Sequence, residues 1–358
     1  MARHITEFKI QSYRGIKDLE LKGLNHINIL TGDNNSGKTS VLELIQSIDN
    51  PKMFSSWYNM LRKNERISIY NQLINLFPVN DDEKTIKYSY QKSDGKEIQV
   101  SLEAEEEYTQ ILEKEKLRLS GYIKTGSPKK DEIERMTDVK CLHLSLALNG
   151  IETEQFSIYD FQTKFPLFSS KDDVEIPTLY ISPTDHIRGF ALKEVLNNSE
   201  MYESMIELLK EFDPNIINIT TVDEYVGQYM ILSKNHKKAL PLNVYGDGMK
   251  KAIMIVAAIV YSKNGILLMD EFETAIHTSA MNRVFEWILT SAKKMNIQIF
   301  LSSHSEEAIK KVLNCKEEFK KDINLYTLYN VDDKNLVRCL NGEEAIYADE
   351  QLGLELRY

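Results

Sequence analysis

The chain has 358 residues, of which 42% are hydrophobic and 27% charged, and this composition excludes disorder of the whole chain. Its formal net charge of −10 argues against a protein that coats nucleic acid, although a local basic patch stays compatible with it. The three cysteines, Cys141, Cys315 and Cys339, lie far apart without a CxxC pair, so no disulfide framework or zinc site is predicted. A reducing compartment fits this cysteine usage best.

The most apolar stretch, residues 252–269, is interrupted by Ser262-Lys263-Asn264-Gly265. Each remaining piece is shorter than the roughly 20 residues that a bilayer-spanning helix needs. The first ten residues lack the apolar core of a secretory signal. We therefore expect a cytoplasmic protein with no membrane partner.

In chain order, residues 1–50 predict three strands and then a helix that starts at Lys38. The strands are expected at Ile5–Ile10, Ile16–Leu21 and His26–Leu30. A cluster of Gly, Asn and Ser residues joins the third strand to the helix. This order is strand, glycine loop, helix.

Residues 51–176 predict a mixed helical and strand insertion. Helices are expected over 51–80, with six core residues: Phe54, Trp57, Leu61, Ile67, Leu73 and Phe77. Strands are expected over 85–103 and at Val139–Leu148. The charge-dense segment 104–136 indicates an exposed helical arm with a loop near Gly126-Ser127-Pro128, and its simplest interpretation is a solvated surface insertion.

Residues 177–245 predict a connecting strand at Thr178–Ile181 and a helix at Met201–Phe212. Residues 246–358 alternate again, with helices at 250–261, 278–293 and 306–313, strands at 266–269 and 297–301, and a strand pair at 324–329 and 335–340. This alternation predicts an α/β fold with a mostly parallel sheet covered by helices. We expect one head spanning residues 1–358, with an N-terminal antiparallel portion and helical insertions.

The segment Gly32-Asp33-Asn34-Asn35-Ser36-Gly37-Lys38-Thr39 fits G-x-x-x-x-G-K-[ST], the phosphate-binding loop. Glycines let backbone N–H groups turn inward around a polyphosphate, and the following helix adds its positive dipole end. Lys38 is expected to bind the β- and γ-phosphates, and the Thr39 hydroxyl to ligate Mg²⁺. The loop therefore predicts ATP and Mg²⁺ as cofactors.

The apolar strand Ile266–Met269 ends in Asp270-Glu271. We expect Asp270 to hold Mg²⁺ and Glu271 to act as the general base that polarises the attacking water. A solvated strand end is the alternative interpretation of such a pair taken alone.

Two weaker patterns accompany these motifs. Gly246-Asp247-Gly248 opens a helix and is either a second anion site, serving the nucleotide of another subunit, or an ordinary helix-entry turn. His304, after the strand Ile297–Leu301, can contact the γ-phosphate or the attacking water, or can be a surface histidine. Ser305 can cap the helix that follows.

In this order the motifs resemble the ABC-class ATPase heads, the superfamily of SMC proteins, RecF and transporter ATPases. Within it the sequence looks most like ATP-binding proteins of the OLD (overcoming lysogenization defect) type, also described as AAA-family ATP-binding proteins. The phrases that carry this resemblance are SYRGI, TGDNNSGKTSVLE, YGDGMKKA, NGILLMDEFETAIH and SSHSEEAI. The resemblance covers residues 1–50 and about 177–358, and hardly touches the middle of the chain.

The resemblance implies a role for each matching position. The Walker A residues would be Gly32, Asp33, Asn34, Asn35, Ser36, Gly37, Lys38, Thr39 and Ser40. Asp270 and Glu271 would be the Walker B pair, His304 the switch histidine and Glu273–His277 the D-loop. Gly246–Lys250 would be the signature that completes the site across a dimer, and Arg14 would contact nucleotide unless it is a plain surface arginine.

The chain also departs from that pattern. Asp247 stands where the signature has a glycine, and a carboxylate near a γ-phosphate is repulsive. No glutamine of a Q-loop can be placed, since Gln46 comes too early and Ile181-Ser182-Pro183-Thr184 occupies the expected region. The segment after His304 is too short for the C-terminal Toprim nuclease domain of OLD-type proteins, and Asp332-Asp333 is expected to be a turn rather than a metal site.

The resemblance implies an ATP-binding and ATP-hydrolysing subunit that forms a homodimer or higher oligomer and controls a separate effector, such as a nuclease, in bacterial antiphage defence. One alternative is a nucleotide-gated scaffold with very slow hydrolysis, which the acidic Asp247 favours. The other is a RecF-like DNA-repair ATPase that binds nucleic acid. A transporter ATPase is the least favoured, because such heads keep a recognisable SGGQ-like signature.

Overall fold

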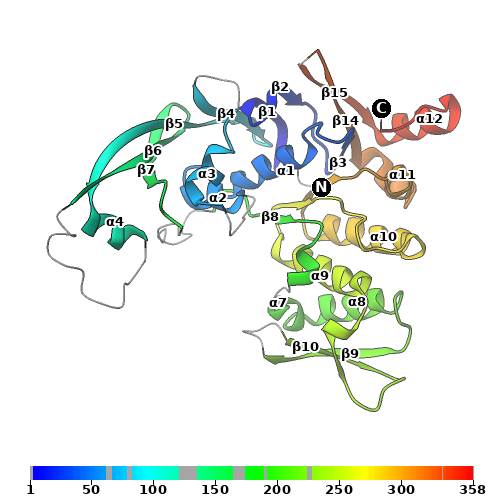
Figure 1. Ribbon diagram of the computed structural model, residues 1–358. Coiled ribbons are helices and arrows are strands. Elements are labelled where there is room, and N and C mark those ends of the chain that lie inside the picture. The colour runs from blue at the N-terminus through cyan, green and yellow to red at the C-terminus, as the bar shows by residue number, and fades with distance from the viewer. Residues whose placement is uncertain are drawn as a thin grey trace. The chain divides into compact units, whose positions relative to one another are not determined.

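The computed structural model describes residues 3–61, 67–78, 83–120, 135–163, 174–188, 192–223, 228–332 and 334–357. The chain forms two compact units, drawn in Figure 1. The first, which we call the nucleotide unit, contains residues 1–6, 21–46 and 176–358. The second, the insertion unit, contains residues 7–20 and 47–175.

The nucleotide unit is built on a six-stranded sheet in the order β15-β14-β3-β13-β12-β8. Its strands are β3 (Ile27–Gly32), β8 (Thr178–Ile181), β12 (Ile266–Met269), β13 (Gln298–Ser302), β14 (Ile323–Val331) and β15 (Lys334–Asn341). All neighbours pair in parallel except β14 with β15. The predicted α/β fold with a mostly parallel sheet is confirmed.

Helices cover both faces of this sheet, which explains why its central strands are apolar without alternation. The helices α9 (Asp247–Tyr261), α10 (Thr278–Lys294) and α11 (Glu306–Leu313) lie side by side in Figure 1 and share one core with Leu267 and Met269. Helix α1 (Lys38–Gln46) packs against β3, β8, β12 and β13. None of the helices in the described ranges is both long enough and apolar enough to cross a membrane.

The nucleotide unit also contains elements that the sequence did not predict. A three-stranded sheet, β11-β10-β9, is formed by β9 (Ile216–Asp223), β10 (Gln228–Ser233) and β11 (Leu240–Pro241). The predicted helix near Met201 is α8 (Ser199–Leu209), preceded by the short helices α6 (Asp185–Arg188) and α7 (Lys193–Leu196). Helix α12 (Gly342–Leu352) follows β15 and begins at a capping box of Asn341 and Glu344.

The insertion unit is built on an antiparallel sheet in the order β2-β1-β4-β5-β6-β7. Its strands are β1 (Ile5–Tyr13), whose first two residues belong to the nucleotide unit, β2 (Ile16–Leu21), β4 (Lys84–Lys92), β5 (Glu97–Leu112), β6 (Met136–Leu148) and β7 (Ile151–Tyr159). Its helices are α2 (Phe54–Asn59), α3 (Ile69–Ile74) and α4 (Glu113–Ser120). Trp57 and Tyr88 are fully buried at its core.

Two expectations for the insertion unit were wrong. Residues 104–112 are strand rather than helix, because β5 pairs with β6 continuously from Val100–Leu148 to Leu112–Met136. The acidic residues there are held by lysines on the neighbouring strands, as where Glu106 lies 3.5 Å from Lys84 and 3.6 Å from Lys140. Ile67, predicted to be core, is 39% exposed because it precedes α3 instead of lying within it. The loop near Gly126-Ser127-Pro128 and the residue Asp333 lie outside the described residues.

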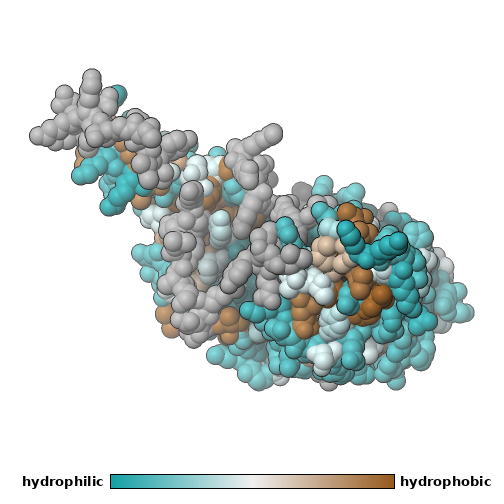
Figure 2. Space-filling model, turned by 90° about the horizontal axis from the view of Figure 1, so that it is seen from below, coloured by the Kyte–Doolittle hydropathy of each residue, from teal (hydrophilic) through white to brown (hydrophobic). Residues whose placement is uncertain are grey.

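The surface carries the polar residues that the composition requires. On the face drawn in Figure 2, hydrophilic residues cover most of the coloured surface, and apolar residues show in smaller areas. The parallel sheet is apolar and buried instead, as in β12, where all four residues are buried. The strand that leads to Asp270 is therefore anchored in the core of the nucleotide unit.

Candidate functional site at the carboxyl ends of the parallel strands

The loop between β3 and α1 is shaped by three residues with left-handed backbone: Gly32 (φ 129°), Asn35 (φ 65°) and Gly37 (φ 100°). Gly32 has a further constraint, because a Cβ atom there would lie 2.0 Å from the carbonyl oxygen of Leu328 on β14. Only glycine fits a position with both constraints. The loop closes with the Ser36 N–H donating to the Asp33 carbonyl at 3.2 Å.

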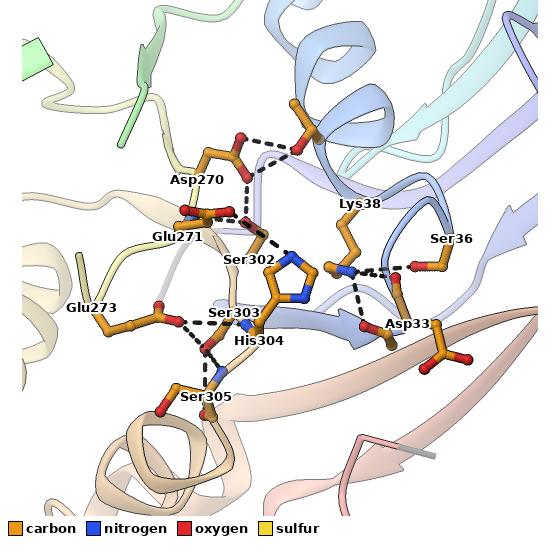
Figure 3. Close-up of polar contacts among 12 residues, drawn as sticks. Asp33, Ser36, Lys38, Asp270, Glu271, Glu273, Ser302, Ser303, His304 and Ser305 are labelled. Atoms are coloured by element: carbon orange, nitrogen blue, oxygen red, sulfur yellow. Dashed lines mark hydrogen bonds and ion pairs between the residues drawn. The ribbon is translucent and has the colours of Figure 1, made fainter. Parts of the chain in front are cut away.

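Lys38, the first residue of α1, is 5% exposed and points into this loop (Figure 3). Its Nζ donates to the carbonyl oxygens of Gly32 at 2.8 Å and Asp33 at 2.7 Å, and lies 3.4 Å from Ser36 Oγ. Burial lowers the pKa of Lys38, while the charge of Asp270 opposes that shift. The ammonium is thus fixed inside the loop where the sequence predicts phosphate binding.

Asp270 follows β12 and is 5% exposed. Three hydroxyl groups donate to its carboxylate: Thr39 Oγ1, at 3.0 Å from Oδ2 and 3.3 Å from Oδ1, Tyr180 OH, at 3.0 Å from Oδ2, and Ser302 Oγ on Oδ1. These donors come from α1, β8 and β13, so the sheet order brings them to one carboxylate. Thr39 and Asp270, which the sequence predicts as the two Mg²⁺ ligands, thus lie within hydrogen-bonding distance of each other.

Glu271 lies next to this centre in a left-handed backbone conformation with φ 43°. Its N–H donates to Ser302 Oγ at 2.9 Å. A positive φ at a non-glycine residue costs of order 1–3 kcal/mol and persists only where the surroundings hold it. Ser302 therefore holds the Asp270 carboxylate through its hydroxyl hydrogen and the backbone of Glu271 through its oxygen.

His304 faces Glu271 across the site, with Nε2 at 3.9 Å from Glu271 Oε1 (Figure 3). Both side chains stay accessible, at 40% and 45% exposed. Ser305 caps α11 by accepting from the Ala308 N–H at 3.2 Å, as the sequence predicts. The carboxylate and the imidazole thus flank one accessible space beside Asp270.

The start of α9 differs from this arrangement. Gly246 is the N-cap with φ −65° and no side-chain cap bond, and Asp247 and Gly248 already belong to the helix. Asp247 is exposed and pairs with Lys250 at 3.0 Å, and the hydrogen bond and charge of that lysine lower the pKa of the carboxyl. A Cβ atom on Gly248 would lie 3.0 Å from the Ala275 carbonyl oxygen, so this glycine is tightly packed within its own unit.

The structure adds Tyr180 and Ser302 to the predicted residues. Ser302 is the last residue of β13 and Tyr180 the last but one of β8, and both strands lie next to β12. Only the sheet order reveals that these two residues approach Asp270. Arg14 belongs to the insertion unit, at a turn with φ 50°, and its nucleotide role stays a prediction. In the region expected for a Q-loop, the Ser182 N–H donates to the Asp185 carboxylate at 2.7 Å.

The donor set fits the predicted cofactors. A carboxylate and a hydroxyl are hard oxygen ligands, and Mg²⁺ is commonly held by one or two carboxylates together with nucleotide phosphates. Asp270 and Thr39 are the residues that would hold it, and the bound ion would supply positive charge for the phosphates. The loop backbone and Lys38 would bind the phosphates, leaving Glu271 and His304 to orient and deprotonate water.

The comparison with family models agrees with this geometry. Residues 27–310 match the model described as "AAA domain, putative AbiEii toxin, Type IV TA system". The chain belongs to this family. The match spans the phosphate loop, Asp270-Glu271 and His304 together.

Individual named proteins resemble the chain at low sequence identity. A protein of Helicobacter pylori named "ATP/GTP phosphatase" is 24% identical over 96% of this chain and 97% of its own length. The "DNA replication and repair protein RecF" of Francisella tularensis subsp. novicida is 31% identical over 30% of this chain, and the match covers 30% of that protein. The match to RecF is thus confined to part of each protein.

Solved structures show the same fold. The SMC head bound to the C-winged helix domain of ScpA has a TM-score of 0.54 at 13% identity, over 96% of this chain and all of that one. The SMC head with an extended coiled coil, bound to the C-terminal domain of ScpA derived from Pyrococcus furiosus, has a TM-score of 0.51 at 11% identity, over 98% and 100%. The chain therefore has an SMC-head, ABC-type ATPase fold.

Proposed function

We propose that the chain binds ATP with Mg²⁺ and hydrolyses it to ADP and phosphate. The observation that carries this proposal is the convergence of Lys38, Thr39, Asp270, Glu271 and His304 at one edge of the sheet (Figure 3). Lys38 would bind the β- and γ-phosphates, and Thr39 and Asp270 would hold Mg²⁺. Glu271, with His304 beside it, would take a proton from the attacking water. The relative named "ATP/GTP phosphatase" supports the same reaction class.

Phosphate release from ATP, with and without Mg²⁺, tests this proposal. Glu271→Gln keeps size and hydrogen bonding but removes the base, so we expect turnover to fall about 10²- to 10⁴-fold while ATP still binds. Glu286→Gln, on the exposed side of α10, is the matched control and should turn over like the wild type. Equal turnover in wild type and Glu271→Gln would contradict the proposal.

We further propose that two copies close around nucleotide, with Gly246 and its neighbours meeting the γ-phosphate held by the other copy. The open start of α9 supports this, because nothing lies within 4 Å of a Cβ placed on Gly246. ATP would then favour the closed pair by ordinary linkage, and blocked hydrolysis would accumulate it. Light scattering of Glu271→Gln with and without ATP tests the point, and an unchanged mass would contradict it.

The biological role that we propose is control of a separate effector, such as a nuclease, in bacterial antiphage defence in the cytoplasm. The family description, with its toxin of a Type IV TA system, supports a role beside a partner protein. Co-expression with the product of the neighbouring gene, followed by purification through a tag on this chain, tests it. Recovery of this chain alone, with and without ATP, would contradict it.

A nucleotide-gated scaffold with very slow hydrolysis is the second candidate. The exposed carboxylate of Asp247 at the start of α9 favours it, because negative charge there opposes a γ-phosphate. ATP-dependent association together with equal phosphate release from wild type and Glu271→Gln would select this candidate. The partial match to RecF supports a DNA-repair role less directly, and salt-dependent duplex binding tests that role.

A further inference from the structure

Glu273 is hydrogen-bonded to the turn that carries His304. Its Oε1 accepts from Ser303 Oγ at 2.7 Å and from the His304 N–H at 3.3 Å (Figure 3). Ser303 is itself fully buried and accepts from the Ser305 N–H at 2.9 Å. Glu273 and Ser303 thus fix the backbone on each side of the imidazole.

The other oxygen of Glu273 is buried, and among the described residues it has no hydrogen-bond partner. Burial raises the pKa of this carboxyl, although the bonds from Ser303 and the His304 N–H work against that shift. A buried carboxylate oxygen without a partner is costly unless an opposite charge lies near.

Lys251 on α9 is a buried cation that could compensate this carboxylate. It is 0% exposed, and its Nζ has no hydrogen-bond partner within the described part of the chain. Burial lowers the pKa of its ammonium to about 8, while the carboxylates of Asp185 and Glu273 raise it, with smaller effects from Asp270 and Glu271. A lysine is retained in such a place only where charge compensates its desolvation.

We propose that Glu273 is the positioning residue for His304 and that Lys251 is its buried counter-charge on α9. Glu273 does not touch the reacting atoms, since it acts through the backbone of the 303–305 turn. Lys251 lies in the second turn of the helix that starts at Gly246. A shift of that helix would move Lys251, change the charge beside Glu273, and alter where His304 lies relative to Glu271.

This inference rests on the proposed hydrolysis for its kinetic test, and a second readout makes it independent of that proposal. Glu273→Ala removes the acceptor, so we expect kcat to fall about 10- to 100-fold at an unchanged KM, the range that a misplaced group costs. Glu273→Gln keeps the Oε1 acceptor and should retain kcat within about threefold, since only a neutral–neutral bond replaces a charged one. A KM that rises while kcat holds would overturn the positioning role.

A double-mutant cycle decides whether Glu273 acts through His304. In a His304→Ala background, Glu273→Ala should lower kcat by less than about twofold further, because the residue that it positions is gone. Full additivity of the two losses would overturn the proposal. Should the wild type not hydrolyse ATP at all, the imidazole NMR signals of His304, assigned with His304→Ala, are the readout. Glu273→Ala should shift them and Glu273→Gln should not, and unshifted signals in Glu273→Ala would overturn the proposal.

The Lys251 part is tested by urea unfolding of the full chain. Lys251→Met keeps the length of the side chain and leaves Glu273 uncompensated, so we expect a lower unfolding midpoint. Adding Glu273→Gln removes that charge and should recover most of the loss, because both buried charges are then absent. Asp185→Asn is the matched control. Recovery by Asp185→Asn and not by Glu273→Gln would show that Asp185 is the counter-charge, and would overturn the link to His304.

Discussion

Two helices of the nucleotide unit begin with glycine and lysine close together, and they begin differently. At α1 the chain passes through three left-handed residues, and Lys38 is turned back into the loop and buried. At α9 the N-cap Gly246 has φ −65°, and Lys250 pairs with Asp247 one turn away. The start of α1 thus has its own backbone and ammonium in place for a phosphate, whereas nothing lies within 4 Å of a Cβ placed on Gly246 at the start of α9.

The difference teaches what a glycine-rich helix start needs in order to bind phosphate by itself. A helix N-terminus attracts anions in every case, but a polyphosphate is held tightly only where backbone and ammonium converge on it. At α1 the ammonium lies inside the loop, 2.7–2.8 Å from two of its carbonyls. At α9 Asp247 neutralises the nearest lysine, so anion binding there depends on what a second molecule supplies.

We expect the largest effect on the free energy of unfolding when Gly32 and Gly246 are each replaced by alanine. Gly32→Ala meets both a positive φ and a backbone oxygen at 2.0 Å, so it should lower the free energy of unfolding by about 3 kcal/mol or more. Gly246→Ala meets nothing within 4 Å and should cost about 1 kcal/mol or less, the difference between N-cap residues. Urea unfolding of both variants measures this, and equal losses would mean that the two loops are equally constrained.

The second comparison is between the lysines. Lys38→Ala removes a charge-assisted contact to phosphate, which contributes roughly 1.5–3 kcal/mol, so ATP affinity should fall about 10- to 150-fold. Lys250→Ala should leave the affinity of the single chain unchanged, because its ammonium is paired with Asp247. Calorimetry with ATP and Mg²⁺ measures both, and unchanged affinity in Lys38→Ala would mean that this loop is not the nucleotide site.

The same contrast explains how far the sequence predicted the structure. The loop at α1 and the strand before Asp270 are local patterns, and β8, β12 and α11 begin and end where the sequence places them. The contacts of Asp270 with Tyr180 and Ser302 were not predicted, because they depend on β8 and β13 flanking β12. Strand order is a property of the whole fold, and no segment of the sequence carries it.

The insertion unit shows the opposite case, in which a local pattern was misleading. Its acidic segment has the composition of a solvated helix, yet residues up to Leu112 extend β5. Pairing with β6 and ion pairs such as Glu106 with Lys140 outweigh helix propensity there. The sheet β11-β10-β9 was not predicted for a related reason. Its short strands are stabilised by pairing with one another, and no single strand shows that pairing in its own sequence.

The third prediction tests the open site directly, in the Glu271→Gln background. Gly246→Glu adds bulk and negative charge without disturbing its own chain, so ATP-dependent association should weaken about tenfold or more, as overpacked contacts cost about 1–3 kcal/mol. Gly248 is unsuited to this test because it packs against Ala275 and Phe212. Tyr261→Glu, at the exposed far end of α9, adds the same charge as a control. Light scattering that shows equal association for both variants would place the dimer contact elsewhere.

The smallest effect concerns Asp247, whose charge opposes a γ-phosphate across the proposed dimer. Asp247→Asn should strengthen ATP-dependent association only a few-fold, because charges in water interact weakly. Lys250 holds the pKa of Asp247 below its usual range. The ionised carboxylate therefore stabilises the folded chain at pH values above the pKa that Asp247 has in the unfolded state. This stabilisation is lost as the pH falls through the lowered pKa of the folded state. The difference between Asp247→Asn and its parent should therefore be constant at neutral pH and disappear only in acid. A difference that already titrates between pH 6 and 8 would assign the repulsion to another group. No difference at any pH would leave α9 as an ordinary helix start, and the two glycine turns would then share a pattern without sharing a function.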